Sequence, residues 1–435
     1  MTDFHIRLAV DIGGTFTDAV LEKDGVYATE KLLTTPAFPA QGFLTAAMKV
    51  LEATGTQPSD VELIIHGTTL ATNALIEQKG AKTALIVTEG HRDSLEIAYE
   101  NRFDQYDIDA HRSPPLVPRH FRLPVIERMN WRGAILIPLD EGSVEALIPE
   151  IERQEIESVA IGLLHAYANP NHEKRIKEIL RAALPDLFIS LSSEVCPEIR
   201  EYDRQSTTCA NAYIQPLMAR YLEDVRESLA ESGFSCPCLI MTSGGSLVTI
   251  DTATDFPVRL LESGPAGGAI LACSIARQLG ENRVISFDMG GTTAKICLID
   301  NGAPLLSRSF EVNRAHRFMK GSGMPVKVPV VEMVEIGAGG GSIARADMGM
   351  IAVGPESAGA DPGPVCYGQG GSLPTITDAN LVLGYINPDA FNGGAMTLDR
   401  EAAAEAIKKH IGDPLDLRLG DGSAGQGDRG KTWHD

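Results

Sequence analysis

The sequence lacks long apolar runs. No window reaches the roughly 20 apolar residues that a membrane-spanning helix needs. Residues 1–7 contain no apolar segment of the kind found in secretory signals. We therefore expect a cytoplasmic protein that does not span a membrane.

Cysteine is scarce, and the seven cysteines are odd in number and scattered along 435 residues. The only close pair, Cys236 and Cys238, has one residue between them and no second pair that would complete a zinc site. A disulfide framework is not expected in a chain of this length. The cysteines are therefore predicted to be reduced thiols.

Basic residues are outnumbered, because 38 lysines and arginines face 58 aspartates and glutamates, for a formal net charge of -20. An acidic protein is a poor binder of nucleic acid and of acidic membrane surfaces. The charge does not exclude a phosphate site, since backbone N–H groups hold phosphates whatever the net charge. No nucleic-acid or membrane partner is predicted.

The rest of the composition is that of a globular protein, with 43% hydrophobic and 22% charged residues. The chain opens with strand-like residues 6–12 and 16–22, an Asp-Gly turn, and a returning strand at 26–33. Strand-like and helix-like segments then alternate, which is typical of an α/β fold. Residues 113–124 carry four prolines and are predicted to form a loop.

The chain shows an internal duplication, because the strand, glycine pair, strand and turn of residues 6–31 recur at residues 283–306. We predict a first domain over residues 1–194 and a second over residues 195–416. Residues 417–435 are rich in glycine, aspartate and arginine and are predicted to be a disordered tail.

Each half of the duplication begins with a phosphate-loop pattern, DIGGTFTD at residues 11–18 and DMGGTTAK at residues 288–295. Glycines let the backbone approach a polyphosphate closely, and successive N–H groups form an anion-binding nest. One such loop alone would equally fit a plain hairpin turn, but two copies favour a phosphate clamp. The predicted phosphate ligands are Gly13, Gly14, Thr15, Thr17, Gly290, Gly291, Thr292 and Thr293.

An aspartate precedes each glycine pair, Asp11 in the first loop and Asp288 in the second. A carboxylate at the end of a strand suits Mg²⁺, which binds one or two protein oxygens and keeps much of its water. Both aspartates are predicted to be catalytic metal-binding groups. Lys295 either neutralises phosphate charge or only flanks the site.

Further motifs make the sequence resemble the hydantoinase A/5-oxoprolinase family over residues 6–417. Besides the two loops, the matching segments are HGTTLATNA at 66–74, SGPAGG at 263–268, EIGAGGGS at 335–342, GPESAGADPGPVCY at 354–367 and TDAN at 377–380. The resemblance implies duplicated ribonuclease-H-like α/β domains of the sugar-kinase/actin/Hsp70 type. It also implies ATP and Mg²⁺ as cofactors.

The activity implied by the resemblance is ATP-dependent hydrolysis of a cyclic amide such as a hydantoin, 5-oxoproline or a lactam. Phosphoryl transfer would activate the amide oxygen, and a B-type subunit would be the partner. Related family members are ATP-using subunits of ketone carboxylases, which is the alternative function. The family pattern ends near residue 415, so we also expect an incomplete second domain with part of its core exposed, and a truncated non-catalytic protein is a third alternative.

Two motif segments have competing interpretations. His66 is either a packed histidine or a catalytic group that faces the substrate amide, and the resemblance favours catalysis. Gly264 and Gly267 open a helix at residues 269–278, where they either bind phosphate or allow close packing.

Four other features are weaker candidates. Residues 337–342 could suggest an adenosine loop, but a substrate-side or structural loop is the better interpretation. Asp361 and Asp378 are either metal or substrate carboxylates or turn residues, and turn residues are the preferred interpretation. A P-loop-like GQGDRGKT at residues 425–432 is rejected, because the chain ends before the required helix.

Overall fold

The computed structural model describes residues 5–14, 16–35, 37–291, 293–312, 314, 319–359, 361–394 and 396–417. The chain forms two compact units, the first comprising Met1–Gly267 with Leu306–Val331 and the second comprising Gly268–Leu305 with Glu332–Asp435. The boundary predicted at residue 194 lies inside the first unit. The tail predicted to be disordered lies, from residue 418 onward, outside the described residues.

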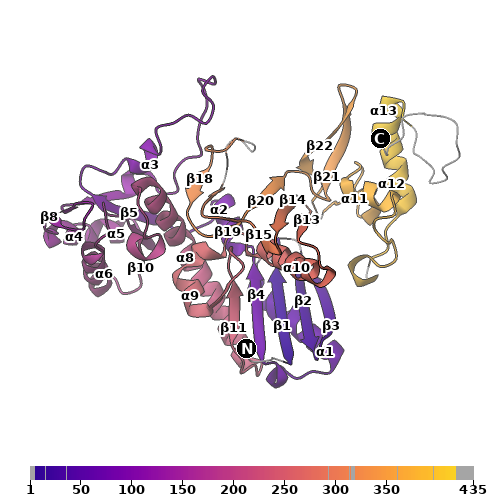
Figure 1. Cartoon of the computed structure of the whole chain (residues 1–435), viewed down its shortest axis with the longest axis horizontal. Helices are drawn as coiled ribbons and strands as arrows, with labels where there is room; N and C mark the ends of the chain where they lie inside the picture. Colours follow the sequence, from indigo (N-terminus) through magenta and orange to yellow (C-terminus); the bar gives the residue numbers. More distant parts are fainter. Residues whose placement is uncertain are drawn as a thin grey trace. The chain divides into compact units, whose positions relative to one another are not determined.

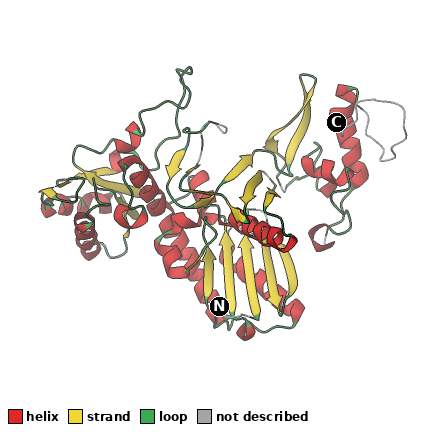
Figure 2. Cartoon of the chain, in the orientation of Figure 1, coloured by secondary structure: helices red, strands yellow, loops and turns green. Residues whose placement is uncertain are grey.

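The first unit contains a six-stranded sheet in the order β12-β11-β4-β1-β2-β3. Its central strand β1 pairs antiparallel with β2, from Ile6 opposite Lys23 to Ile12 opposite Thr17, and parallel with β4. The predicted hairpins are confirmed (Figure 2). The strands are β1 (Ile6–Ile12), β2 (Phe16–Lys23), β3 (Val26–Leu33), β4 (Leu63–Thr68), β11 (Cys238–Met241) and β12 (Leu247–Thr249).

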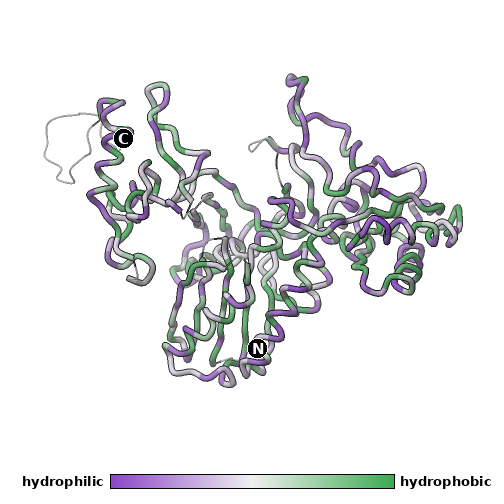
Figure 3. Tube along the Cα trace, turned by 180° about the vertical axis from the view of Figure 1, so that it is seen from behind, coloured by the Kyte–Doolittle hydropathy of each residue, from purple (hydrophilic) through white to green (hydrophobic). Residues whose placement is uncertain are grey.

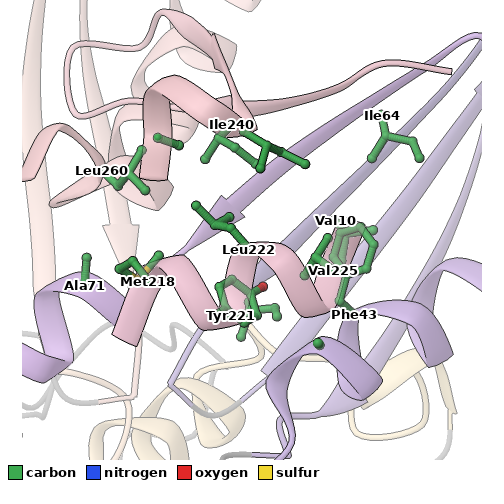
Figure 4. Close-up of a cluster of buried hydrophobic side chains, with 14 of the residues drawn as sticks. Val10, Phe43, Ile64, Ala71, Met218, Tyr221, Leu222, Val225, Ile240 and Leu260 are labelled. Carbon is green, nitrogen blue, oxygen red and sulfur yellow. The ribbon is translucent and has the colours of Figure 1, made fainter. Parts of the chain in front are cut away.

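Two helices build the core of this sheet. α1 (Pro39–Thr54) buries Phe43, Ala46, Ala47 and Val50, whose spacing of three to four residues forms one apolar stripe. α8 (Glu201–Glu231) adds Met218, Leu222 and Val225 to the same core (Figure 4). β1 and β4 are hydrophobic over most of their length, as a sheet packed by helices requires (Figure 3).

A second sheet of the first unit is wholly parallel, in the order β10-β9-β5-β6. Every residue of β5 and β9 is buried. α8 also packs against β5, β9 and β10, so this helix serves both sheets (Figure 1). The strands are β5 (Thr83–Thr88), β6 (Arg122–Val125), β9 (Ser158–Ile161) and β10 (Phe188–Leu191).

Short helices and small strand pairs complete the first unit. The helices are α2 (Leu70–Ile76), α3 (Ser94–Ile97), α4 (Glu141–Glu145), α5 (Ile148–Arg153), α6 (Asn171–Ala183), α7 (Ser192–Val195) and α9 (Ile250–Asp255). The strands are β7 (Arg128–Met129), β8 (Ile135–Ile137), β16 (Leu306–Ser307), β17 (Phe310–Val312), β18 (Met324–Val326) and β19 (Val330–Val331).

The second unit is organised around a hairpin, β13 (Arg283–Met289) and β14 (Ala294–Asp300), with β15 (Ala303–Pro304) and β20 (Met333–Ile336) beside β14. A two-stranded ribbon and short helices follow. They are β21 (Ser342–Asp347), β22 (Met350–Ser357), α11 (Ile376–Val382), α12 (Arg400–Ile407) and α13 (Asp413–Leu415). The helix α10 (Ser263–Leu279) joins the two units along the chain.

The predicted duplication is confirmed by strand register. β1 and β2 pair from Ile6–Lys23 to Ile12–Thr17, and β13 and β14 pair from Arg283–Asp300 to Met289–Ala294. In both ladders the loop aspartate sits one residue before the end of its strand. The two hairpins are therefore equivalent position by position.

Candidate functional site

The first phosphate loop is a tight turn between β1 and β2. The backbone N–H of Gly13 donates to the carbonyl of Phe16 at 2.9 Å, and a Cβ on Gly13 would lie only 3.0 Å from that oxygen. No atom lies within 4 Å of the position that a Cβ on Gly14 would take, and Gly14 is exposed. The turn therefore leaves the backbone at Gly14 accessible to a phosphate.

One predicted phosphate ligand of this loop, Thr17, has its hydroxyl engaged within the protein. Thr17 is buried, and its Oγ1 lies 3.1 Å from Oγ1 of Thr34, which donates to the carbonyl of Gly13 at 2.9 Å. These contacts of Thr34 hold the turn in place. Thr15 lies outside the described residues.

Asp11 lies where three sequence segments meet. It is paired with Gly67 of β4, and a Cβ on Gly67 would lie 2.5 Å from Oδ1 of the aspartate. A Cβ on Gly264 would lie 3.5 Å from Oδ2. The two glycines belong to different motifs, and both border the same carboxylate.

Hydrogen bonds tie these three segments together within the first unit. Thr69 donates from its N–H and its hydroxyl to the carbonyl of Ile12, at 3.0 and 3.2 Å, and Ser263 Oγ donates to the carbonyl of Thr68 at 3.1 Å. We call this assembly the first-loop site. It consists of Asp11, Gly13, Gly14, Gly67, Thr68, Thr69, Ser263 and Gly264.

His66 is not on an open surface, because its ring is fully buried. Its Nδ1 lies 2.9 Å from the carbonyl of Val10, so this nitrogen carries the proton, and Nε2 accepts from the Tyr221 hydroxyl at 2.6 Å. Burial lowers the pKa of His66 to about 4, and Phe43 packs edge-on at 4.8 Å. This placement favours the packed histidine of the two interpretations, and the catalytic role stays a prediction.

The glycines at the start of α10 have two different environments. Gly264 borders Asp11, whereas a Cβ on Gly267 would lie 3.1 Å from the sulfur of Met241. Close packing therefore accounts for Gly267. The anion-binding interpretation retains support only at Gly264.

The second phosphate loop repeats the turn of the first. Gly290 N–H donates to the carbonyl of Thr293 at 2.9 Å, as Gly13 does to Phe16. Asp288 and Gly291 are exposed, and Lys295 is the cross-strand neighbour of Asp288. Thr292 lies outside the described residues.

The glycine-rich segment at 337–342 packs directly against the second loop. Gly340 and Gly341 donate their N–H groups to the carbonyls of Gly290 and Gly291, at 2.8 and 2.7 Å. A Cβ on Gly340 would lie 2.7 Å from Oγ1 of Thr377. These contacts support the interpretation of a structural loop.

Asp378 is a structural carboxylate. It is fully buried and accepts hydrogen bonds from the N–H groups of Val365, Cys366 and Thr375 and from the Thr375 hydroxyl, at 2.8 to 3.2 Å. With Thr375 it forms the capping box of α11. Asp361 is exposed.

The described residues contain no group of three or more histidine, cysteine, aspartate or glutamate side chains that could hold a metal alone. Each loop instead offers one carboxylate beside a glycine turn, a donor set that fits Mg²⁺ shared with nucleotide phosphates. In the same part of the chain, no helix is long and apolar enough to cross a membrane.

Two residues that support the motif residues from outside could not be found from the motifs alone. Thr34 follows β3 and braces Gly13, and Tyr221 lies 155 positions from the histidine to which it donates. Neither residue belongs to a recognisable pattern. Ser263 does lie in a motif, but the sequence alone assigns no partner to its hydroxyl, which donates to the distant Thr68 carbonyl.

Comparison with known proteins assigns the chain to a family. Residues 7–184 match the model described as the hydantoinase/oxoprolinase N-terminal region, and residues 204–425 match the hydantoinase/oxoprolinase model. The caprolactamase subunit alpha of Pseudomonas jessenii is 40% identical over 429 residues, covering 96% of this chain and 60% of the relative. The acetone carboxylase beta subunit of Xanthobacter autotrophicus is 32% identical, covering 97% and 60%.

A solved structure shares the fold. The crystal structure of ATP-dependent caprolactamase from Pseudomonas jessenii has a TM-score of 0.79 at 40% identity, covering 94% of this chain and 59% of that one. The fold is therefore α/β of the actin-like ATPase type, as predicted. The chain spans about 60% of the length of the curated relatives it matches.

Proposed function

The chain belongs to the hydantoinase/oxoprolinase family, and on that premise we propose that it uses Mg·ATP to open a cyclic amide. The substrate class is a hydantoin, 5-oxoproline or a lactam. The observation that carries the proposal is the first-loop site, where an aspartate, an open glycine turn and two further motifs converge. Such a site offers backbone N–H groups and a carboxylate to a nucleotide's phosphates.

Each loop has a role in this proposal. Gly13 and Gly14 present N–H groups to phosphate oxygens, and Gly290 and Gly291 do so in the second loop. Asp11 and Asp288 hold Mg²⁺ through its water, and the ion when bound supplies charge neutralisation at the phosphates. Thr15, Thr292 and Thr293 are proposed as hydroxyl donors to the phosphates on the basis of the loop motifs alone.

The proposed reaction balances as follows. The amide oxygen attacks the terminal phosphorus of ATP, the bond to ADP breaks, and the activated carbon then accepts water. The ring C–N bond and the C–O bond to phosphate break, and the products are ADP, phosphate and the ring-opened amino acid, or its N-carbamoyl derivative when the substrate is a hydantoin. The chain's own contribution is to hold the phosphates in line and to stabilise their charge.

The names of the relatives support both the proposal and its alternative. One relative is named as an alpha subunit of a caprolactamase, which would open a lactam, and another as a beta subunit of an acetone carboxylase. Both are named as subunits, so we propose that this chain acts with a B-type partner. A bicarbonate requirement for ATP turnover would favour the carboxylase alternative.

The decisive experiment is phosphate release from Mg·ATP by the chain with its partner subunit, with a panel of cyclic amides and with acetone plus bicarbonate. We expect release that depends on a cyclic amide. Release only with ketone and bicarbonate would favour the carboxylase. No release with any substrate would favour the non-catalytic alternative.

A matched pair of variants tests the site within that experiment. Asp11→Asn should weaken Mg·ATP binding by at least about tenfold, because it removes the charge beside Gly67 and Gly264. Asp18→Asn, in the same motif but ion-paired with Lys31, should bind within about threefold of the wild type. Equal binding by both variants would exclude Asp11 from the nucleotide site.

A further inference from the structure

A cavity of about 310 Å³ lies in the first unit beside the N-terminal part of α8. Its wall is formed by α3, the loop at residues 111–116, one side of α8 and β18, which lie near one another in Figure 1. None of the residues of the first-loop site lines it. Because ligand pockets span ~300–1,000 Å³, this volume suits a small molecule.

One part of the wall is apolar. It consists of Leu95, Pro114, Pro115, Leu116, Cys209 and Met324. Leu95 and Cys209 are buried, so this part of the wall is held by the packing of α3 and α8. A ligand with a short hydrocarbon part would be stabilised by burying it here.

The polar part of the wall contains a hydroxyl with no partner inside the protein. Ser206 lines the cavity and is only 2% exposed. Its neighbours Thr207 and Thr208 donate their hydroxyls to helix carbonyls at 2.7 Å, whereas within the described residues Ser206 makes no such bond. Since buried polar groups are nearly always hydrogen-bonded, the Ser206 hydroxyl is available to a ligand.

Arg112 adds a positive charge to the lining. Its guanidinium donates to the carbonyl of Asn101 and, at 3.1 Å, to Oδ1 of the same neutral residue. In the part of the chain that the structure describes, it forms no ion pair. Burial raises the pKa of Tyr202, another lining residue, and the nearby charge of Arg112 opposes that rise. The charge of Arg112 is therefore not neutralised by a carboxylate.

A second guanidinium lies in the wall itself. Arg122 is 1% exposed, donates from Nε to the carbonyl of Val117 at 3.0 Å and from Nη2 to Glu96 at 2.9 Å, and among the described residues has no partner for Nη1. Glu96 and Cys209 both line the cavity, and the charge of Arg122 opposes the rise in pKa that burial causes in the Cys209 thiol. The Glu96 side chain is 51% exposed, so water screens its charge more than that of Arg122.

The charges around the cavity favour an anion. Two guanidinium groups, of Arg112 and Arg122, stand against the single carboxylate of Glu96. This local excess of positive charge is set against a chain whose net charge is -20. A carboxylate accepts hydrogen bonds from a guanidinium and from a hydroxyl together, and such charge-assisted bonds are the strong ones.

We propose that this cavity binds a small organic carboxylate. Its carboxylate group accepts hydrogen bonds from Arg112 and from the Ser206 hydroxyl. Its hydrocarbon part lies against Leu95, Leu116 and Met324. The buried guanidinium in the wall favours the anion over a neutral molecule of the same shape. The site does not rest on the proposed phosphate chemistry.

Titration of the full 435-residue chain with hexanoate, without nucleotide, tests the proposal. We expect saturable binding at least about tenfold tighter than that of hexan-1-ol, which has the hydrocarbon part but no charge. Inorganic phosphate, which has the charge but no hydrocarbon part, should not displace hexanoate at equal concentration. In protein with isotopically labelled methionine methyl groups, the signal of Met324 should shift as hexanoate binds.

Two variants test the predicted contacts separately. Arg112→Gln should weaken hexanoate binding by at least about tenfold, because it removes the charged donor. Ser206→Ala should weaken it by about fivefold and leave the urea unfolding midpoint unchanged, since the hydroxyl has no partner in the free protein. The matched control is Arg102→Gln, an exposed arginine of the same loop that does not line this cavity, and it should bind within about twofold of the wild type.

Four results would overturn the proposal. They are no saturable binding by the folded chain, equal binding of hexanoate and hexan-1-ol, displacement of hexanoate by phosphate, and wild-type affinity in both Arg112→Gln and Ser206→Ala. The titration contains no nucleotide, so its outcome is separate from that of the phosphate-release experiment.

Discussion

Gly67 shows that a motif glycine can be required by a side chain far away in the sequence. The motif glycines were predicted to let a phosphate approach the backbone, and Gly14 fits that reason. Glycine is required at position 67 for a different reason, because the carboxylate of Asp11 occupies the space that a Cβ would take. A single sequence could not reveal this, since the contact depends on the pairing of β1 with β4.

A Gly67→Ala variant should therefore damage the first-loop site. Its new methyl group would displace the carboxylate 2.5 Å away, weaken Mg·ATP binding by about tenfold or more, and reduce the free energy of unfolding by about 1–3 kcal/mol. Titration calorimetry and urea unfolding measure the two effects. Gly268→Ala, with no atom within 4 Å of the new Cβ, is the control and should retain both properties; a Gly67→Ala variant that matched it would disprove the contact.

His66 makes a prediction about pH. Its pKa of about 4 in the folded protein is below the ordinary histidine value of 6.5, so the unfolded chain gains the proton first as the pH falls. The contribution to stability is complete above pH 6.5 and is lost between pH 6.5 and about 4. Between pH 7.5 and 4.5 the free energy of unfolding should fall by about 2–3 kcal/mol on account of this group.

Urea unfolding at several pH values measures this loss. His66→Gln should be less stable at pH 7.5 but should lack that part of the pH dependence. His120→Gln, an exposed histidine, should behave like the wild type. An unchanged pH profile in His66→Gln would mean that the ring is not held neutral in the core.

At the scale of elements, apolar runs and the Asp-Gly turn predicted the strands at 6–12, 16–22 and 26–33, which are β1, β2 and β3 to within one residue. One difference is β6, whose residues 122–124 fall at the end of the stretch 113–124 predicted to be a loop. Its residues Arg122–Val125 include Pro124, and β6 is the edge strand of its sheet, where a proline is tolerated. Proline content could not distinguish an edge strand from a loop, because sheet order is a property of the tertiary fold.

The start of α11 depends on one carboxylate. Asp378→Ala removes the acceptor of four hydrogen bonds and should reduce the stability of the second unit by about 3 kcal/mol. Hydrogen exchange of residues 365–378 should increase strongly. The control, Asp347→Ala at the exposed end of β21, should change stability by less than about 0.5 kcal/mol, and equal effects would contradict the capping role.

At the scale of the whole molecule, the sequence predicted the duplication, and the matching registers confirmed it. The division at residue 194 stays a prediction: it falls between the two family-model matches, over 7–184 and 204–425, whereas the compact units divide after Gly267. The sequence predicts that part of the second domain's core is exposed, but not which residues: Leu8 and Val10 are at most 1% exposed, whereas Ile285 and Phe287 are 67% and 57% exposed. Which side chains are left open depends on the register and on which face α10 occupies.

Labelling of the buried cysteines can compare the stability of the two units. Cys273 and Cys297 are buried in the second unit, whereas Cys209 is buried in the first, where burial raises its pKa to about 12. All three should be unreactive in the native protein. Because Ile285, Phe287 and Leu298 of the second unit are each more than half exposed, pulsed thiol labelling in urea should modify Cys273 and Cys297 at a midpoint about 1 M lower than Cys209.

Mass spectrometry of the labelled peptides locates each modified thiol. Cys236, which is partly exposed, should be the earliest labelled and serves as the internal reference. Coincident midpoints for all three buried cysteines would show that the exposed apolar residues do not weaken the second unit.

The long helix α8 has a consequence for how this family can exchange parts. It packs on the parallel sheet and also on the sheet that carries the first loop, so both sheets depend on the same 31 residues. A recombination event that joined the first 194 residues of one relative to the remainder of another would pack the α8 of the second relative against strands that come from the first. Viable crossovers in this region should therefore inherit α8 together with everything that precedes it.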